Sequence, residues 1–315
     1  MYQIAATPRP RWEQLPAAVR QRISSAVGSS VTSARSATAG FSNGFAGSLV
    51  LDDGRWAFVK AIAENTNPVG AQLYRDEALV LAQMPGEAPV PGLLAWFDED
   101  VASDRWVCLL IEHIDGRAPD LRRPGEVDRL VDLTIRLADF DPCPIPGLPA
   151  LADDAATFDR WRHVDGADPG LGSYDPWLCR HLERVIATAS GWSAAIDGSA
   201  LTHGDLRPDN ILVTDQGAWA VDWPSAAVGA PWVDTLLMLP ALAMLEAGPA
   251  PAGVARTHPL LTGGDPAAID TALAAALGYF VTSSLLDPPP GLPTVRAFQR
   301  AQAEVLLRWL RERWD

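Results

Sequence analysis

One polar loop of the chain carries three side chains whose types and spacing could do chemistry. His203, Asp205 and Asn210 follow one another there in the order His-x-Asp-x-x-x-x-Asn. An aspartate in such a loop can orient a hydroxyl group and accept its proton, and an asparagine oxygen can hold a divalent cation. The loop closes into a short apolar strand ending at Val213, and after a turn at 215–217 a second strand is predicted at 218–221. A second carboxylate, Asp222, ends that strand. These residue types indicate a site where a metal ion and a reacting hydroxyl meet.

A single lysine is the second feature with chemical meaning. The chain has 25 Lys and Arg residues, and Lys60 is the only lysine among them. A single lysine in so arginine-rich a chain suggests a position where the wide, planar guanidinium group of arginine cannot replace the ammonium group of lysine. Strand alternation over 55–62 places Phe58 on the same face as Lys60, and Glu77 on the helix predicted at 68–84 is the natural ion-pair partner. The competing explanations are a solvated cation at a strand end and an exposed helix carboxylate.

The glycine-rich segment 40–44, Gly-Phe-Ser-Asn-Gly, lies between the first two predicted strands. Its Ser42 could donate its hydroxyl and its backbone N–H to a phosphate oxygen. The same five residues also spell Gly-x-Ser-x-Gly, the nucleophile elbow of α/β-hydrolases. That elbow needs a helix directly after it, whereas a strand and the hairpin signal at 52–54 follow here. The phosphate-binding interpretation is therefore favoured.

The letters of the polar loop resemble those of a kinase catalytic loop. Residues 203–210 read His-Gly-Asp-Leu-Arg-Pro-Asp-Asn, against His-Arg-Asp-Leu-Lys-Pro-Glu-Asn in protein kinases. The glycine at the second place makes the loop more similar to the aminoglycoside phosphotransferase and choline kinase-like superfamily. The resemblance covers roughly residues 30 to 245 and is specific mainly at Lys60, the 203–212 loop and Asp222. It implies an ATP-dependent phosphotransferase with an alcohol group as acceptor.

The resemblance implies roles for the residues of the loop and its surroundings. Asp205 would be the catalytic base, and Asn210 and Asp222 would be ligands of Mg²⁺. Two roles stay open for Arg207, which would either face a phosphate or the acceptor, or bridge to nearby carboxylates. His203 is expected to pack the loop rather than to act as a base.

The remaining candidates would bind the nucleotide or brace the loop. Glu112 and Ile114 would present backbone groups to adenine, and Phe58 would stack on it. The expected nucleotide-binding residues are Lys60, Glu77, Phe58, Ser42, Glu112 and Ile114. Asp209 and Asp234 are expected to accept hydrogen bonds from backbone N–H groups. Trp161, Trp177 and Trp192 are core residues by their type, with an acceptor pocket as the alternative.

The implied fold class is α+β, in a bilobal protein-kinase-like arrangement. A small nucleotide-binding lobe, 30–112, would hold a five-stranded antiparallel sheet plus a helix. A large, mainly α-helical lobe, 113–315, would carry catalysis and the acceptor site, and 1–29 would be an extension with a helix. Residue periodicity agrees with this division. It predicts strands at 31–39, 48–51, 55–62, 93–97 and 106–111, with a turn at 98–100, and helices at 12–27, 68–84, 127–138, 155–163, 176–187, 232–245, 270–285 and 294–314.

Two features argue against a protein kinase. Only eleven residues separate Asp222 from Asp234, too few for an activation loop, and Gly204 replaces the arginine that reads activation-loop phosphate. The favoured function is transfer of the γ-phosphoryl group of ATP or GTP to a small molecule, with an aminoglycoside-like antibiotic as the leading substrate. Choline, sugars, homoserine and macrolides are alternatives, and a non-catalytic nucleotide-binding pseudokinase is the competing class.

Composition excludes several other kinds of partner. The net charge of −14 argues against nucleic acid and anionic membrane surfaces. Three cysteines at unrelated spacings imply neither a disulfide framework nor a zinc site. The longest apolar run, 235–245, is too short to span a bilayer and the first residues lack a signal-peptide core, so a cytoplasmic location is expected.

Overall fold

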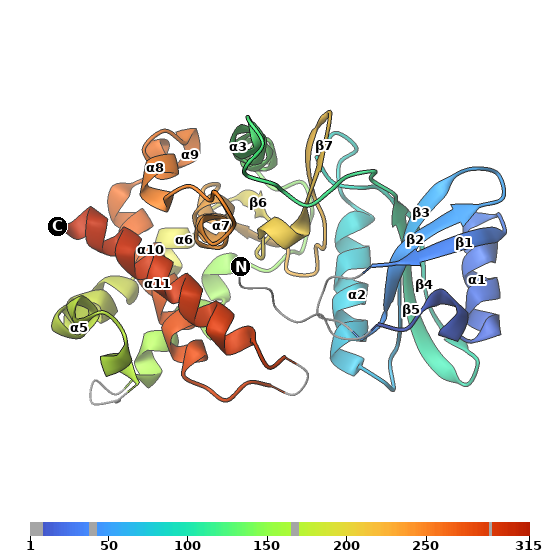
Figure 1. Ribbon diagram of the computed structural model, residues 1–315, viewed down its shortest axis with the longest axis horizontal. Helices are drawn as coiled ribbons and strands as arrows, with labels where there is room; N and C mark the ends of the chain where they lie inside the picture. Colours follow the sequence, from blue (N-terminus) through green and yellow to red (C-terminus); the bar gives the residue numbers. More distant parts are fainter. Residues whose placement is uncertain (1–8, 38–42, 165–169, 290–291) are drawn as a thin grey trace. The chain divides into compact units, whose positions relative to one another are not determined.

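The chain divides into two compact units, which a computed structural model describes over residues 9–37, 43–164, 170–289 and 292–315. One unit runs to Ala118 and includes Asp209–Ala226, and we call it the sheet unit. The other, the helical unit, comprises Pro119–Pro208 and Ala227–Asp315 (Figure 1). Strands concentrate in the first and helices in the second, so the expected mixed α and β composition is confirmed.

The core of the sheet unit is an antiparallel sheet, formed within the described residues by five strands in the order β1-β2-β3-β5-β4 (Figure 1). This is the sheet that the sequence predicts for the small lobe. Strands β2 and β3 are joined by a short turn, as are β4 and β5, and α2 stands between β3 and β4. The bounds are β1 Val31–Ser36, β2 Phe45–Leu51, β3 Trp56–Ala63, β4 Leu93–Val101 and β5 Asp104–Glu112.

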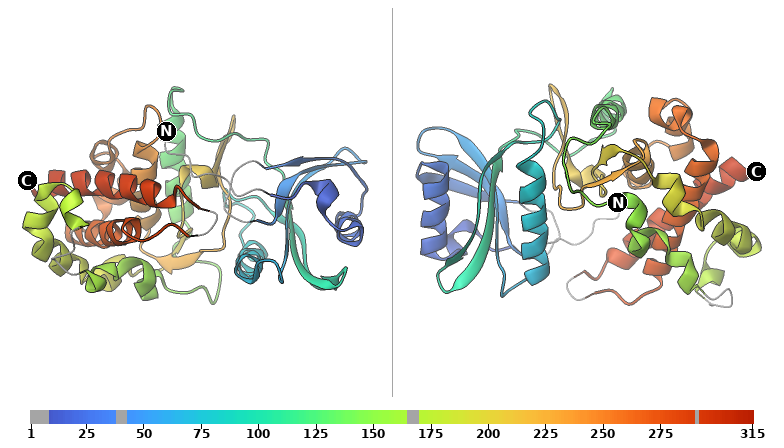
Figure 2. Two further views of the ribbon diagram at one scale, coloured as in Figure 1. Left: turned by 60° about the horizontal axis from the view of Figure 1, so that its bottom comes forward. Right: turned by 180° about the vertical axis from the view of Figure 1, so that it is seen from behind.

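Two helices cover opposite faces of this sheet (Figure 2). Helix α1, Ala17–Val27, packs one face and buries a core of apolar side chains. The predicted helix over 12–27 is broken because Pro16 forces Leu15 into an extended conformation, and a separate 3₁₀ turn, Trp12–Gln14, precedes it. This core contains Trp12, Leu15, Val19, Ile23, Phe45, Leu49, Val59, Ala61, Cys108 and Leu110.

Helix α2, Pro68–Leu81, covers the other face of the sheet. Asn67 caps its first turn by accepting a hydrogen bond from the Gly70 N–H at 2.8 Å. A Cβ atom on Gly70 would lie 2.7 Å from Cδ1 of Ile62 on β3. Only glycine therefore lets the start of α2 approach the sheet so closely.

The turn between β4 and β5 lies beyond the predicted place. The sequence predicts a turn at 98–100, but these residues continue β4, and the turn falls at Ala102 and Ser103, whose φ angles are 55° and 67°. Such positive angles suit a two-residue hairpin turn. The prediction was wrong because the carboxylates of Asp98 and Glu99 accept hydrogen bonds from arginines, which stabilises charged residues within the strand.

A hairpin completes the sheet unit. Strands β7, Ile211–Thr214, and β8, Gly217–Ala220, pair in antiparallel register as the sequence predicts. The hairpin is tied to the rest of the unit because the Ala220 N–H donates to the Pro89 carbonyl at 2.9 Å. This attachment places Asp222, which follows β8, in the same unit as Lys60.

The helical unit is built around α10, Pro266–Ser284, which contacts α5, α6 and α11. Within the described residues, α10 alone is long and apolar enough to cross a membrane, but 56% of its most apolar window is buried in the protein. That burial is the property of a core helix. The other helices are α3 Glu126–Ala138, α4 Ala155–Phe158, α5 Pro176–Ala189, α6 Trp192–Ile196, α7 Val233–Ala243, α8 Pro251–Ala255, α9 Pro259–Gly263 and α11 Val295–Trp314.

Three details of the helical unit differ from the predictions. The helix predicted over 155–163 breaks at Asp159 into α4 and a 3₁₀ turn, Arg160–His163. Helix α10 starts earlier than expected because Asp265 caps it and Pro266 takes its first position. The short strands β6, Ala200–Thr202, and β9, Ala227–Gly229, pair with each other although the sequence predicts neither by its periodicity.

The tryptophans considered for an acceptor pocket lie in the core. Trp161, Trp177 and Trp192 are all buried. Trp161 donates from Nε1 to the Ala274 carbonyl at 2.7 Å and packs against Gly278, where a Cβ would lie 2.6 Å from that nitrogen. The core interpretation accounts for their burial without a substrate.

Buried His258 is expected to make the stability of the helical unit depend on pH. Its neutral ring accepts the Leu260 N–H at Nδ1 (3.3 Å) and donates from Nε2 to Thr134 Oγ1 (2.9 Å). Burial lowers the pKa of His258 below its usual 6.5. The unfolded chain therefore gains a proton as the pH falls through 6.5, whereas the folded protein resists it. The free energy of unfolding should decrease there by up to about 1.4 kcal/mol per pH unit.

Urea unfolding at pH 7.5, 6.5 and 5.5 measures this effect. His258→Asn should show a smaller decrease, since asparagine still caps α9 but does not titrate. Burial also lowers the pKa of His113, so a residual slope is expected in the variant. Equal slopes in wild type and variant would show that His258 is not the group responsible.

Candidate active site

The loop after β6 is held by hydrogen bonds to its backbone. Asp234 on α7 accepts the N–H groups of His203 and Gly204 at 2.6 and 3.1 Å. The His203 ring is fully buried, and its Nδ1 accepts the Asp205 N–H at 3.3 Å. The expected bracing role of Asp234 and packing role of His203 are both present in this geometry. The bracing role expected of Asp209 stays a prediction.

Gly204 explains the shape of the loop, and Asp234 its electrostatics. Gly204 has a φ of 75°, a left-handed angle that favours glycine over the arginine found there in protein kinases. Burial raises the pKa of Asp234, while the neighbouring His203 ring and the two backbone N–H groups lower it, and the net direction is upward. The hydrogen bonds thus satisfy a carboxyl group that has been removed from water.

Asp205, the predicted catalytic base, stands partly exposed beside Arg207. Its Oδ1 lies 3.2 Å from Arg207 Nη1. Of the two roles considered for Arg207, the bridge to a nearby carboxylate is therefore realised in this structure. The contact holds the aspartate side chain without covering it, since 44% of that side chain remains exposed.

Lys60 is the centre of the charged cluster in the sheet unit. Its Nζ lies 2.7 and 2.6 Å from the two carboxylate oxygens of Glu77 and 2.6 Å from Oδ1 of Asp222. The pairing with Glu77 is the one expected from the sequence. The contact with Asp222 was not foreseen, because the two residues are 162 positions apart and no local pattern links them.

Burial differs sharply among these three charges. The exposed fractions of the side chains are 12% for Lys60, 2% for Glu77 and 49% for Asp222. Burial alone lowers the pKa of Lys60, but the charges of Asp222 and Glu77 outweigh it and raise that pKa above its usual value. Burial raises the pKa of Glu77, against the opposing effect of the Lys60 ammonium group. The lysine is thus held charged between two acids.

The two predicted metal ligands lie side by side on the β7–β8 hairpin. The Val221 N–H donates to the Asn210 carbonyl at 2.9 Å, so Asn210 is opposite the residue that precedes Asp222. Within the described residues, no group of three or more His, Cys, Asp and Glu side chains gathers as a metal site. One amide and one carboxylate, both oxygen donors, fit a hard cation whose other ligands come from water and phosphates.

The backbone at Asp222 is strained, and its neighbour Trp223 holds it. Asp222 has a φ of 70°, a left-handed angle that costs a side chain with a Cβ about 1–2 kcal/mol. Trp223 is buried, donates from Nε1 to the Ala220 carbonyl at 3.0 Å and donates its N–H to Glu77 at 3.4 Å. Trp223 was missed from the sequence, although its place next to Asp222 was a signal for it.

Glycine and alanine at position 222 should separate this strain from the loss of the carboxylate. Both variants lose the contact with Lys60, but only glycine adopts the left-handed angle without cost. We expect Asp222→Gly to be more stable than Asp222→Ala by about 1 kcal/mol. Urea unfolding of the two variants measures the difference. An alanine variant as stable as the glycine variant would contradict the strain.

One face of the sheet carries the residues predicted to bind adenine and phosphate. Ala46 of β2 pairs with Lys60 and Ser48 with Phe58, so these four side chains share a face, as strand alternation predicts. Tyr74 of α2, which was missed, lies below the ammonium group, with its ring centroid 5.9 Å from Nζ. Ser42 lies outside the described residues.

The segment after β5 was predicted to offer backbone groups to a base. The Glu112 N–H donates to the Gly92 carbonyl at 2.8 Å, and the Ile114 carbonyl accepts the Gly116 N–H at 2.9 Å. The backbone groups predicted to bind adenine are the carbonyl of Glu112 and the N–H of Ile114, and this role stays a prediction. His113 between them bonds to Ser48 at 3.2 Å and stacks on Trp56, an arrangement the sequence did not suggest.

Comparison with known proteins gives a family match over most of the chain. Residues 38–270 match the sequence profile described as "Phosphotransferase enzyme family". No curated protein matches the sequence.

Solved structures match the fold over nearly the whole chain. A thermostable mutant of aminoglycoside phosphotransferase APH(4)-Ia, in complex with ADP and hygromycin B, is 14% identical with a TM-score of 0.61, covering 94% of this chain and 98% of that one. A protein described as a fructosamine-3-kinase from Thermobifida fusca YX-ER1 is 21% identical with a TM-score of 0.57, covering 92% and 98%. Macrolide 2′-phosphotransferase MphH from Brachybacterium faecium is 17% identical with a TM-score of 0.51, covering 92% and 95%. These likenesses confirm the expected protein-kinase-like α+β fold.

Proposed function

The chain belongs to the phosphotransferase enzyme family, and we propose that it transfers the γ-phosphoryl group of ATP or GTP to a hydroxyl group of a small molecule. One observation carries this proposal. Lys60 contacts Glu77 and Asp222 at once, with all three distances between 2.6 and 2.7 Å. A buried cation set between a helix carboxylate and a candidate metal ligand is the arrangement that binds nucleotide phosphates in kinases.

In this proposal Lys60 contacts the α- and β-phosphates of the nucleotide, and Glu77 keeps its ammonium group in place. Because Asp222 is half exposed, its carboxylate can turn from Lys60 towards a cation, and Asn210 beside it adds an amide oxygen. Mg²⁺ held by Asn210 and Asp222 would neutralise charge on the β- and γ-phosphate oxygens. Phe58, on the same sheet face as Lys60, would stack on the base, and Glu112 and Ile114 would bond to its edge.

Asp205 is the proposed catalytic base, since it is exposed and fixed in a braced loop. It would orient the acceptor hydroxyl and accept its proton as the oxygen bonds to the γ-phosphorus. The phosphoryl group then leaves the nucleotide, which departs as the diphosphate. Asp205 and Asn210 are five positions apart in one loop, so the base and a metal ligand belong to the same chain segment.

The proposed acceptor is an aminoglycoside-like antibiotic. Its support is the set of similar structures, which includes APH(4)-Ia with hygromycin B, together with the acidic charge of the chain, −14. The proteins described as a fructosamine-3-kinase and a macrolide phosphotransferase make sugars and macrolides the alternatives. We propose residues 30–112 as the nucleotide-binding lobe, 113–315 as the acceptor lobe and 1–29 as an N-terminal extension, in a cytoplasmic enzyme with its three cysteines free.

Turnover on a panel of acceptors tests the proposal. Purified protein is incubated with Mg²⁺ and ATP or GTP, and with aminoglycosides, macrolides, amino alcohols and sugars, while release of the diphosphate is followed. Calorimetry with ADP and Mg²⁺ measures binding separately. Acceptor-dependent release supports the enzyme. Nucleotide binding without turnover on any acceptor favours a pseudokinase, and absence of nucleotide binding contradicts the proposal.

A further inference from the structure

The apolar pattern of α2 does not determine which face of the helix meets the sheet. Val69, Leu73 and Leu79 are 71%, 42% and 53% exposed. The buried residues of the helix include a glycine, two alanines and a carboxylate, and are Gly70, Ala71, Tyr74, Glu77, Ala78, Val80 and Leu81. Burial of leucine is worth more than burial of alanine, so hydrophobic packing alone does not fix the rotation of the helix about its axis.

Two charged side chains of α2, Arg75 and Glu77, make ion pairs on different sides of the helix. At 3.6 residues per turn, Arg75 and Glu77 lie about 160° apart, measured across Tyr74. Leu73 is four residues before Glu77, and Leu79 is four residues after Arg75. Around the helix, each leucine is therefore next to one of the two charged residues, on the side away from Tyr74. Rotation of the helix in either direction would bury a leucine and displace Glu77 from Lys60.

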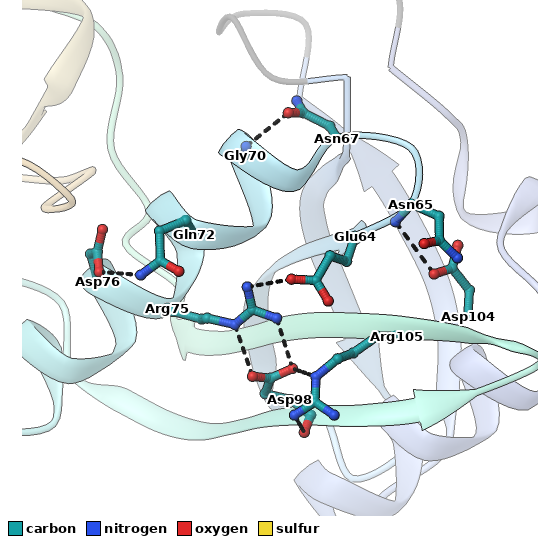
Figure 3. A network of polar contacts seen from close by, with 10 residues as sticks. All are labelled: Glu64, Asn65, Asn67, Gly70, Gln72, Arg75, Asp76, Asp98, Asp104 and Arg105. Carbon is teal, nitrogen blue, oxygen red and sulfur yellow. Dashed lines mark hydrogen bonds and ion pairs between the residues drawn. The ribbon is translucent and has the colours of Figure 1, made fainter.

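Arg75 anchors the helix against such a rotation (Figure 3). Its Nε and Nη2 donate to the two oxygens of Asp98 on β4 at 2.8 and 3.2 Å, and its Nη1 donates to Glu64 at 2.8 Å. Arg105 of β5 fixes Asp98 in turn, through a bond of 2.7 Å to Oδ1. The Arg75 side chain is 18% exposed and thus partly shielded from water. A fork held by two acids resists motion more than a single ion pair does.

We propose that Arg75 is the residue that positions Glu77 against Lys60, by fixing the rotation of α2 through Asp98 and Glu64. Arg75 touches no reacting group, and its effect on nucleotide binding passes through Glu77. This part of the inference rests on the proposed function. The geometric part, the dependence of the Lys60–Glu77 pair on Arg75, does not.

The chain contains a matched control on the other face of the sheet. Arg22 of α1 donates to both oxygens of Glu99 at 2.8 Å, and Glu99 is the residue next to Asp98 on β4. Because strand residues alternate between faces, Glu99 pairs with Arg22 of α1 on one face of the sheet, and Asp98 pairs with Arg75 of α2 on the other. Removing Arg22 breaks the same kind of contact without touching α2.

The experiment uses the fact that Lys60 is the only lysine in the chain. The full-length protein is treated with an acetylating reagent, and modification of Lys60 is followed by mass spectrometry, with the N-terminal amine as internal standard. The variant Glu77→Gln shows how much the rate of Lys60 acetylation rises when the Lys60–Glu77 ion pair is lost. A lowering of the Lys60 pKa by one unit raises the reactive amine fraction, and hence the rate, about tenfold. We expect such an increase for Arg75→Ala, a smaller one for Arg75→Lys, and none for Arg22→Ala.

Nucleotide binding gives the second readout. ADP with Mg²⁺ should bind about tenfold more weakly to Arg75→Ala than to wild type, and with unchanged affinity to Arg22→Ala. If Arg75→Ala reacts at Lys60 like wild type, the inference is wrong, and equal effects of the Arg75 and Arg22 variants would also overturn it. Should Arg75→Ala fail to fold, Arg75→Lys and Asp98→Asn are judged by the same criteria. Failure of wild type to bind nucleotide would refute the proposed function, while Lys60 acetylation would still decide the role of Arg75.

Discussion

Replacing Asp205 with Asn is expected to lower kcat on any accepted substrate by about 10²–10⁴-fold. The substitution keeps the size of the side chain but removes the group that accepts the proton of the attacking hydroxyl. The loop should keep its conformation, because its bracing bonds run from the backbone of His203 and Gly204 to Asp234. The affinity for ADP with Mg²⁺ should change little.

Steady-state turnover and calorimetry on the same preparation check this expectation. Asp215→Asn is the matched control, since Asp215 is an exposed aspartate in the β7–β8 turn and should leave kcat unchanged. Loss of kcat together with a large loss of nucleotide affinity would indicate that Asp205 supports the fold of the site instead. Undiminished turnover would exclude it as the base.

Replacing Lys60 with Met is expected to have the largest effect on stability. It leaves Glu77, which is 1% exposed, as a carboxyl group without its cation, and Asp222 without the same partner. Removing one member of a buried ion pair costs about 3–5 kcal/mol. Asp222 can turn to water because it is half exposed, so most of the cost should come from Glu77. Nucleotide affinity should fall as well, since the cation for the phosphates is gone.

A double-mutant cycle measures the interaction directly. Urea unfolding of Lys60→Met, Glu77→Met and the double variant should show that the double variant recovers most of the lost stability, because two apolar side chains can replace a buried pair. Lys60→Arg retains the charge, but its planar fork cannot place one nitrogen 2.6–2.7 Å from all three acceptors. A strictly additive cycle would mean that the pair contributes no interaction energy.

Much of the secondary structure could be predicted because its signals are local. The alternation over β3, the turn residues between β7 and β8, and the capped helical pattern of α5 each depend on neighbours a few positions away. The misplaced turn at 98–100 shows the limit. Three acidic residues in a row are typical of a turn, and only the arginines of α1 and α2, distant in sequence, make two of them strand residues.

In the candidate site, too, local features could be predicted and contacts between distant segments could not. The residue types, the spacing of His203, Asp205 and Asn210, and the uniqueness of Lys60 can all be read from the chain, because these are properties of one segment or of composition. The contact of Lys60 with Asp222 and the contact of Arg75 on α2 with Asp98 on β4 are seen only in the folded structure. Such contacts join segments far apart in the chain. Their partners are chosen by sheet register and helix rotation, which many weak interactions set together and which no local pattern encodes.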